Sequence, residues 1–540
     1  MNTETSFPQH PKILHSQRAL AATLLSGVLL VAAAGAAGAQ LFTRGNLLLT
    51  SPDAGGLTGS STISGDFDGD GFADLAVGAP WTGVAGAPQA GEVLVWYGSA
   101  SGLGSRVRFR QGLNGLPGTP EDGDSFGLSL AAGDFDGDGF ADLAVGIPYE
   151  DVPSGSGPIV AAGGVEVIHG SNSGLVTAGA QIFNQESPGI GGALEPSDFF
   201  GMVLEAGDFN GDGFLDLAIG APDEDVGTAI NAGNLTILFG TAGGLTGIGS
   251  ETFDEAGAGG SVAEFNQFGQ ALASGDFDDD DHADLAVGVP GEVVNGHANA
   301  GAVWIFSGVD GGLSVPGLFL HQGRVLASGT IAGVAEADDQ FGCSLAAGDF
   351  NRADAQSPRY QDLAIGVAGE NGEVGAVEIL AGSANGILAT GNFLFSESAL
   401  IGAGTSVLFG YNLAAGPLHS GVRADLVVLS ALDEVGTTSN AGRLFVIPGS
   451  ASGLQLGLAD EFDCATPGLA CGPPTAFGGF GSAMAIGNFD GREVKDLAIG
   501  IAGWDSDGGD PDGAVEVLWS ALFAADFETH DRSQWSSSVP

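Results

Sequence analysis

The segment GDFDGDGFADLAVGAP, residues 65–80, places four aspartates within nine residues and runs directly into an apolar stretch. Asp66, Asp68, Asp70 and Asp74 occupy positions 1, 3, 5 and 9 of a loop whose position 6 is a glycine, which permits a sharp turn. Carboxylates this close repel one another at neutral pH unless a cation lies between them. Because ligand sets made only of oxygen favour calcium or magnesium over zinc or copper, the loop predicts a site for a hard divalent cation.

The loop differs from the calcium loops that lie between helices. An EF-hand or dockerin loop shares positions 1, 3 and 5 but needs a glutamate at position 12 and flanking helices. Position 12 here is Val77, inside the apolar stretch, so neither interpretation fits. The aspartate at position 9 is expected to complete the ligand set together with the backbone carbonyl at position 7. The alternative is a solvated acidic turn that holds no metal.

The acidic segment is one of seven related segments. Their first loop positions are 66, 134, 208, 276, 349, 417 and 488, separated by 68, 74, 68, 73, 68 and 71 residues. A Phe-Gly pair precedes the loop by eight residues in six units, and Thr58-Gly59 replaces it in the first. A strand-like segment that ends in a Gly-rich turn follows each loop, as in GEVLVWYGSASGL from Gly91. This regularity predicts an array of seven structural units.

Each unit contains the pattern of four strands. One precedes the acidic loop, two follow it, and a shorter fourth strand lies near Phe109 in the first unit. The DLAVG strand is apolar at consecutive positions, so both faces of its sheet must be covered. Stacked blades around an axis do this, and we predict an all-β fold, a seven-bladed β-propeller of four-stranded antiparallel blades with calcium-binding hairpin loops. A β-solenoid is the rival, but its repeats are usually shorter.

Closure of the ring requires the two ends of the chain to meet. The segment QLFTR, residues 40–44, lies at about the right distance before Thr58 to supply the fourth strand of the seventh blade. The competing candidate is the segment 523–528 near the end of the chain. We predict that the N-terminal segment closes the ring.

The Phe-Gly pair, the D-x-[DN]-x-D-G-x-x-D loop and the Gly-Ala-Pro that follows it resemble the FG-GAP repeats of the integrin α-subunit β-propeller, and the resemblance covers essentially the whole chain after residue 39. It implies about four calcium ions in the hairpin loops on one face of the ring, with ligand contacts on the opposite face. The fourth loop departs from the pattern with Asp281 at the glycine position, where aspartate tolerates a left-handed backbone. The implied metal-site residues, with the position 7 carbonyls included, are Asp66, Asp68, Asp70, Phe72, Asp74; Asp134, Asp136, Asp138, Phe140, Asp142; Asp208, Asn210, Asp212, Phe214, Asp216; and Asp276, Asp278, Asp280, His282, Asp284.

Three loops have altered ligand positions. The fifth is stretched between Asp349 and Asp362, and Arg492 takes position 5 of the seventh. In the sixth, ligands are replaced by Pro417, His419 and Gly421. An arginine can itself neutralise carboxylates, so the seventh loop is expected to keep its shape without metal.

The N-terminus has the pattern of a secretory signal. Lys12 and Arg18 precede an apolar run over residues 19–34, and Ala37-Gly38-Ala39 fits cleavage before Gln40. A membrane anchor is the alternative, although the run is short and no later segment is apolar enough to span. We therefore divide the chain into a signal peptide (1–39), the propeller (40–525) and a C-terminal tail (526–540), with the mature protein secreted, periplasmic or on the cell surface.

The net charge of the chain limits the classes of molecule that it can bind. The formal net charge of −52 argues against nucleic acid and anionic membranes as partners. Three cysteines are present, Cys343 in a strand-like stretch and the pair Cys464 and Cys471. An exported chain favours a disulfide between that pair, and two buried thiols are the alternative.

Motifs of catalysis are few. The chain has no H-E-x-x-H or P-loop motif, and a polysaccharide lyase would need basic residues that are scarce here. We predict a non-enzymatic adhesion or recognition module with an extracellular protein or glycan ligand; a lectin, a secreted polysaccharide lyase or hydrolase, and a purely structural envelope component are the alternatives. The loops between the second and third strands are candidate ligand surfaces, and one of them could hold further metal at Asp505, Asp507, Asp510 and Asp512. Three arginines alternate on the outer strand of the first unit and are expected to guard an exposed sheet edge: Arg106, Arg108 and Arg110.

Overall fold

The computed structural model describes residues 46–50, 55–155, 157–351, 359–402, 407–419, 423–435, 438, 440–466, 469–471, 478–492, 494–505 and 511–519. The chain divides into two units, Met1–Thr43 and Arg44–Pro540, and the second holds every described element. The predicted signal peptide and C-terminal tail both lie outside the described residues. No helix among the described residues is long and apolar enough to cross a membrane.

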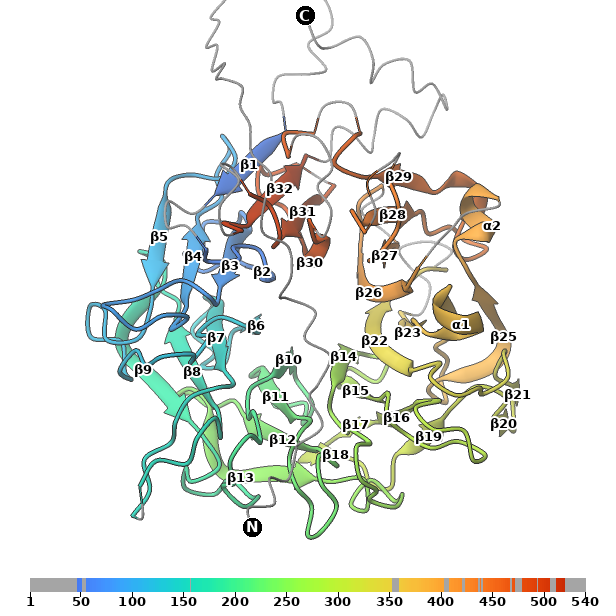
Figure 1. Ribbon diagram of the computed structural model, residues 1–540, viewed down its shortest axis with the longest axis horizontal. Coiled ribbons are helices and arrows are strands. Elements are labelled where there is room, and N and C mark those ends of the chain that lie inside the picture. The colour runs from blue at the N-terminus through green and yellow to red at the C-terminus, as the bar shows by residue number, and fades with distance from the viewer. Residues whose placement is uncertain are drawn as a thin grey trace, which may run out of the picture. The chain divides into compact units, whose positions relative to one another are not determined.

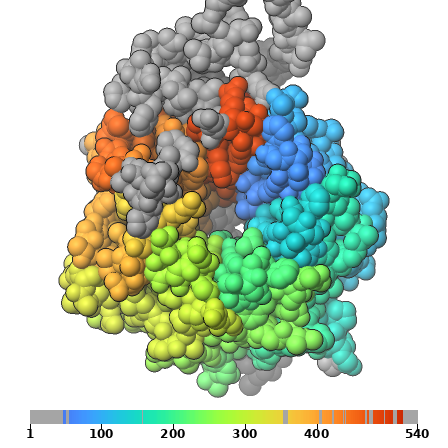
Figure 2. Space-filling model, turned by 180° about the vertical axis from the view of Figure 1, so that it is seen from behind, coloured from blue at the N-terminus to red at the C-terminus, as the bar shows by residue number. Residues whose placement is uncertain are grey.

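The second unit is a seven-bladed β-propeller, as predicted, and each blade is a four-stranded antiparallel sheet (Figure 1). Colour runs around the ring from blue to red, and the red blade lies beside the blue one when the molecule is seen from behind (Figure 2). The strands of blades 1 to 4 are β2 (Ser61–Gly65), β3 (Asp74–Ala79), β4 (Glu92–Trp96), β5 (Arg106–Phe109); β6 (Leu130–Gly133), β7 (Asp142–Ile147), β8 (Gly164–His169), β9 (Val176–Phe183); β10 (Val203–Gly207), β11 (Asp216–Ala221), β12 (Asn234–Phe239), β13 (Thr246–Phe253); and β14 (Ala271–Gly275), β15 (Asp284–Val289), β16 (Ala302–Phe306), β19 (Leu318–Leu320).

The remaining blades follow the same order. Blades 5 to 7 consist of β22 (Phe341–Gly348), β23 (Asp362–Val367), β24 (Ala376–Ala381), β25 (Leu388–Phe395); β26 (Phe409–Gly416), β27 (Asp425–Ser430), β28 (Arg443–Ile447), β29 (Asp460–Phe462); and β30 (Phe480–Gly487), β31 (Asp496–Ile501), β32 (Ala514–Leu518), β1 (Leu47–Thr50). Short elements decorate the ring: β17 (Gly308–Val309), β18 (Gly312–Leu313), β20 (Val325–Leu326), β21 (Gly329–Thr330), α1 (Glu370–Glu373), α2 (Ser398–Ile401) and the 3₁₀ turn η1 (Leu456–Leu458).

The N-terminal segment closes the ring, as predicted, because β1 pairs with β32 from Leu47 opposite Val517 to Thr50 opposite Ala514. The strand begins beyond the predicted residues 40–44, which lie outside the described residues, as does the competing segment 523–528. Arg106 strengthens this closure, since its Nη1 donates to the carbonyl of Thr50 over 2.8 Å.

The core lies between the blades. All six residues of β3, and of its counterpart in every other blade, are buried, which confirms that both faces of each sheet are covered. Seven apolar clusters each draw on two neighbouring blades, including one that joins blade 7 to blade 1. The phenyl ring of Phe126, from the Phe-Gly pair of blade 2, is fully buried in such a cluster. Burial of a ring this size contributes roughly 1.5–3 kcal/mol.

Close backbone approach explains the glycines of the repeat. A Cβ built on Gly78, the glycine of Gly-Ala-Pro in blade 1, would lie 2.0 Å from the carbonyl oxygen of Gly127 in blade 2. A Cβ built on Gly500 in blade 7 would likewise lie 2.1 Å from the carbonyl oxygen of Gly59 in blade 1. Thr58-Gly59 therefore packs against its neighbour as the Phe-Gly pairs do. Only residues without a side chain allow neighbouring blades this close.

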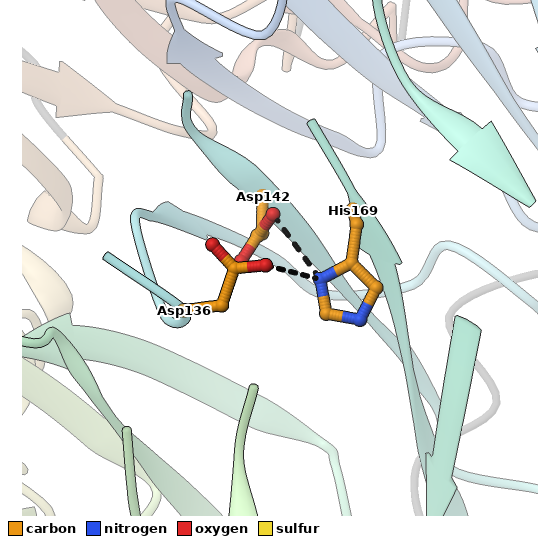
Figure 3. Close-up of side chains that lie close together, drawn as sticks. All are labelled: Asp136, Asp142 and His169. Carbon is orange, nitrogen blue, oxygen red and sulfur yellow. Dashed lines mark ion pairs between the residues drawn. The ribbon is translucent and has the colours of Figure 1, made fainter. Parts of the chain in front are cut away.

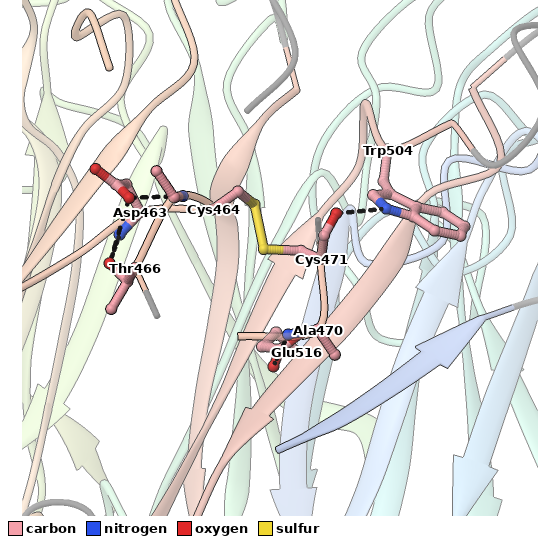
Figure 4. Close-up of a disulfide and its surroundings, with 8 residues drawn as sticks. Asp463, Cys464, Thr466, Ala470, Cys471, Trp504 and Glu516 are labelled. Atoms are coloured by element: carbon pink, nitrogen blue, oxygen red, sulfur yellow. Dashed lines mark hydrogen bonds between the residues drawn. A yellow bond between two sulfur atoms is a disulfide. The ribbon is translucent and has the colours of Figure 1, made fainter. Parts of the chain in front are cut away.

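A disulfide joins Cys464 and Cys471 in the connection from blade 6 to blade 7, which confirms the prediction (Figure 4). The loop it closes contacts blade 7 through hydrogen bonds. Nε1 of Trp504 donates to the carbonyl of Cys471 over 3.1 Å, and the amide of Ala470 donates to Oε1 of Glu516 over 2.9 Å. The third cysteine, Cys343, is a free thiol in β22.

Candidate metal centres

The acidic loops are the hairpins that join the first and second strands of the blades. In blade 1 the carboxylate of Asp66 accepts the amide N–H groups of Asp70, over 3.1 Å, and of Gly71, over 2.9 Å. The amide of Phe72 in turn donates to Asp70 over 2.9 Å. Loops 2 and 3 repeat the same three bonds. The position 1 carboxylate therefore holds the turn in the shape that gathers the other carboxylates.

Three of the four predicted loops bring three of their carboxylates together, with ligand oxygens within 4.8 Å of one another, and these clusters could hold a metal ion. In the third loop Asn210 replaces one carboxylate, and its Oδ1 accepts the amide of Asp212 over 2.9 Å. Burial and the neighbouring Asp70 raise the pKa of Asp68. The clusters are Asp66, Asp68, Asp70; Asp134, Asp136, Asp138; and Asp276, Asp278, Asp284.

The aspartate at position 9 is a structural residue as well as a candidate ligand. Asp74 is fully buried, and its two oxygens accept the amide of Phe67, over 2.8 Å, and that of Gly98, over 2.7 Å. This links the acidic loop to the end of the third strand. Burial is the main cause that raises the pKa of Asp74 to about 7. Blades 5 and 6, whose loops are altered, keep both links in Asp362 and Asp425, so the residue has the same structural role where the loop is not acidic.

The loops also form a continuous circle. The amide at position 8 of each loop donates to the position 1 carbonyl of the preceding blade, as from Ala141 to Asp66 over 3.0 Å, and Ala73 closes the circle on Asn488 over 2.8 Å. The side chain at position 7 packs on the same neighbour, since a Cβ on Gly69 would lie 2.6 Å from the ring of Phe140. A change in one loop is therefore transmitted directly to the next.

The fourth loop keeps its turn despite its extra aspartate. Asp281 stands at the glycine position with φ 71°, which confirms the left-handed backbone expected there. Its amide donates to Asp276 over 3.2 Å, as glycine does in the other loops.

A histidine joins the second site from another strand. Nδ1 of His169, at the end of β8, lies 3.4 Å from Oδ1 of Asp142 and 3.6 Å from Oδ2 of Asp136 (Figure 3). The hydrogen bond to Asp142 is the main cause that raises the pKa of His169. No pattern in the sequence predicts this neighbour, because His169 lies 27 positions after Asp142 and blade 1 has Tyr97 in its place.

In the three altered loops a side-chain donor from the loop contacts a carboxylate. Nδ2 of Asn351 donates to both oxygens of Asp362, over 2.9 and 2.8 Å, in blade 5. Nε of Arg492 lies 3.2 Å from Asp490 in blade 7, as expected from the sequence.

Blade 6 uses the most buried of these donors. The imidazole of His419 bridges Asp425, over 3.2 Å, and Asp460, over 3.3 Å. Burial lowers the pKa of His419, but the hydrogen bonds to the two carboxylates outweigh it and raise the pKa to about 9. The imidazole therefore carries a positive charge at neutral pH. Gly421, the third altered position, lies outside the described residues.

Two further predictions concern the rest of the ring. Nε of Arg108 lies 3.6 Å from the buried Glu92 and Arg106 contacts β1, so these side chains bind within the ring as well as lining its edge.

Of the proposed additional metal group, Asp507 and Asp510 lie outside the described residues.

Comparison with known proteins agrees with the repeat structure. The FG-GAP repeat family model matches residues 58–96, 126–162, 200–238 and 268–306. Integrin alpha-PS2 of Drosophila melanogaster is 33% identical over 183 residues, which are 33% of this chain and 12% of that protein. The phosphatidylinositol-glycan-specific phospholipase D of Mus musculus is 35% identical over 162 residues, 29% of this chain and 18% of that protein. The chain thus spans less than a fifth of either relative.

Among solved structures, the rhamnogalacturonan lyase YesW aligns with 85% of this chain and 71% of its own, at 14% identity and a TM-score of 0.39.

Proposed function

Because the chain is an FG-GAP repeat protein that resembles the integrin α-subunit β-propeller, we propose that it is an exported adhesion or recognition module whose ring is stabilised by about four calcium ions. The observation that carries the proposal is the division of the ring into two faces. One bears the acidic loops, which join into a circle, and the other bears the long connections between second and third strands. The first face suits a structural ion and the second suits variable ligand contacts.

Calcium would act in loops 1 to 4 as the protein donors act in loops 5 to 7. The predicted ligands offer only oxygen, as calcium prefers. Since the ion binds the folded hairpin and not the unfolded chain, it stabilises the native state. The position 7 carbonyls of Phe72, Phe140, Phe214 and His282 complete the proposed set.

The recognition surface is proposed on the connections of blades 2 to 4. These expose apolar side chains, among them Tyr149, 39% exposed, and Ile230, 49% exposed. Phe265, 52% exposed, adjoins them from the connection between β13 of blade 3 and β14 of blade 4. The amide of Phe265 donates to the carbonyl of Ile230 over 2.9 Å, so neighbouring connections support each other. Exposed aromatic and aliphatic groups on a polar surface favour binding of a protein or glycan.

A binding measurement tests this function. The purified chain, immobilised in calcium, is expected to retain a ligand from extracellular matrix proteins or a glycan array. The double variant Ile230→Ser, Phe265→Ser should lose most of that binding, with an unchanged melting temperature. Equal binding by the variant and the wild type would contradict the proposed surface, and retention from the glycan array alone would identify a lectin.

The match to a phospholipase D supports an enzyme as a second candidate. Incubation of the purified chain with acidic polysaccharides and with phosphatidylinositol-glycan substrates tests it. We expect no product above the level given by heat-denatured protein. Turnover would mean that the protein is a secreted lyase or hydrolase and not a recognition module.

The division of the chain remains part of the proposal. Residues 1–39 would be removed on export, and residues 40–525 would form the mature propeller, followed by the tail 526–540. N-terminal sequencing of protein secreted from an expressing cell should begin at Gln40. A start at Met1 would contradict the signal peptide.

A further inference from the structure

Three polar side chains lie together between blades 1 and 2, toward the ends of the strands away from the acidic loops; two are buried and the third, Glu150, is half-buried. Gln111 follows β5, Glu150 follows β7, and Glu166 lies within β8. Nε2 of Gln111 donates to Oε2 of Glu150 over 2.8 Å, and the charge of Glu150 acts on Glu166. Gln111 is 2% exposed and Glu166 is 0% exposed. The cluster is therefore inside the ring wall.

The cluster contains oxygens that no protein group satisfies. Both carboxylate oxygens of Glu166 and Oε1 of Gln111 are buried without a hydrogen-bond partner. Gly118 packs closely against the side-chain amide of Gln111, because a Cβ built on Gly118 would lie 2.6 Å from Nε2 of Gln111. A buried carboxylate without a partner is strongly destabilising, so its charge needs a counter-ion or a proton.

Within the described part of the chain, no basic group acts on Glu166. Burial is the main cause that raises the pKa of Glu150, and the hydrogen bond from Gln111 lowers it. The charged groups that act on Glu150 are Asp124, Glu121 and Asp151, which are all acidic and raise its pKa further. Burial is also the main cause that raises the pKa of Glu166 to about 9. The cluster thus concentrates negative charge around oxygens that lack donors.

Two other blades carry a buried glutamate at the matching strand position, and each of these glutamates has a hydrogen-bond donor. Glu378 in β24 accepts the amide of Ala332 over 3.3 Å, and Glu516 in β32 accepts the amide of Ala470 over 2.9 Å. Both thus receive a backbone N–H group. Glu166 differs from these two counterparts in having no donor to either oxygen.

We propose that Glu166, Glu150 and Gln111 form a second type of cation site, placed between blades 1 and 2 and separate from the acidic loops. Its ligands would be two carboxylates and the amide Oε1 of Gln111, an oxygen set suited to calcium. The ion would neutralise the buried charge and link β8 of blade 2 to the end of blade 1. It adds one ion to those proposed for the loops.

The test counts bound calcium in the full chain by equilibrium dialysis at saturation. Glu166→Gln keeps the shape of the side chain and removes its charge, and we expect it to bind one ion fewer than the wild type. Glu186→Gln, at an exposed position, is the matched control and should bind the same number as the wild type. Equal counts for all three proteins would overturn the site and would mean that Glu166 is neutralised by a proton.

A second variant keeps the test valid if Glu166→Gln folds poorly. Gln111→Glu retains a ligand oxygen and adds a negative charge, so calcium should raise its melting temperature by more than it raises that of the wild type. An equal increment would contradict the site. Failure of the loops to bind calcium would lower all counts together and leave the difference between Glu166→Gln and Glu186→Gln intact, so the two proposals fail separately.

Discussion

Blades 1 to 4 and blades 5 to 7 stabilise the same hairpin in different ways. The first four gather carboxylates with no basic side chain from their own loop, apart from the position 7 imidazole of His282 in blade 4. In the last three, a donor within the loop contacts a carboxylate: the amide of Asn351, the imidazole of His419 or the guanidinium of Arg492. The difference indicates that the carboxylates of the hairpin need partners, which side-chain donors supply in blades 5 to 7 and which we propose calcium supplies in blades 1 to 4.

The largest effect is expected where the position 9 aspartate is removed from a blade with its own donor. Asp425→Ala would leave the amides of Leu418 and Gly449 without this acceptor and would remove one of the two carboxylates that the imidazole of His419 bridges. Breaking a buried pair of this kind costs about 3–5 kcal/mol. Urea unfolding should show the same loss in calcium and in chelator. A loss seen only in calcium would mean that blade 6 holds metal.

The donor of blade 6 also predicts a loss of stability at alkaline pH. The pKa of His419 is about 9 in the folded state, above its value of about 6.5 in the unfolded chain. The stabilisation is therefore complete below pH 6.5 and is lost as the pH rises through about 9, by about 3 kcal/mol in total. Unfolding measured from pH 6 to 10 in saturating calcium should show this decline.

His419→Asn is the matched control, because it removes the titrating group from the same position. Its unfolding free energy should be lower than that of the wild type at pH 6 and should fall less between pH 6 and pH 10. A decline as steep as that of the wild type would assign the pH dependence to another group.

A loop of the acidic type should respond to calcium instead. Asp68→Asn removes one proposed ligand from blade 1, and at calcium a hundredfold above the dissociation constant the loss is about 2–3 kcal/mol. In chelator the variant should be as stable as the wild type or slightly more so, because Asp70 repels Asp68. Thermal unfolding in calcium and in chelator checks both expectations, a loss of stability in calcium and no loss in chelator. An equal loss in chelator would assign Asp68 a purely structural role.

The smallest effect on stability is expected from converting an altered loop into an acidic one. Arg492→Asp would place carboxylates at positions 3, 5 and 9 of loop 7, beside Asn488. The ion pair it breaks is partly exposed, with Arg492 41% exposed, and contributes at most about 1 kcal/mol. Equilibrium dialysis should find one additional calcium ion. Arg492→Gln is the control and should gain none; an equal count in both variants would contradict the comparison.

The sequence predicted the ring because the repeat is recognised from spacing and residue type alone, without knowledge of contacts between distant segments. The spacing of the acidic segments gave seven units, the consecutive apolar residues of β3 required cover on both faces, and the replaced pair Thr58-Gly59 marked the first blade. Local turn chemistry likewise predicted the backbone of Asp281. These features depend on neighbouring residues along the chain.

What the sequence did not predict depends on contacts between segments far apart in the chain. His169 reaches the second loop from another strand, and the circle of bonds through Ala73 and Asn488 joins opposite ends of the chain. His419 was recognised only as a lost ligand, since its partner Asp460 lies 41 residues away. The closing strand was assigned to the correct end but lies at Leu47–Thr50, because a four-residue edge strand has little pattern of its own.

The most direct test of the account is to locate calcium in crystals of the full chain by anomalous scattering. The account predicts a peak among the carboxylates of each of loops 1 to 4, beside Asp68, Asp136, Asn210 and Asp278, and no peak beside Asn351, His419 or Arg492. Loops 1 to 4 without peaks in millimolar calcium, or peaks of equal height in all seven, would contradict it.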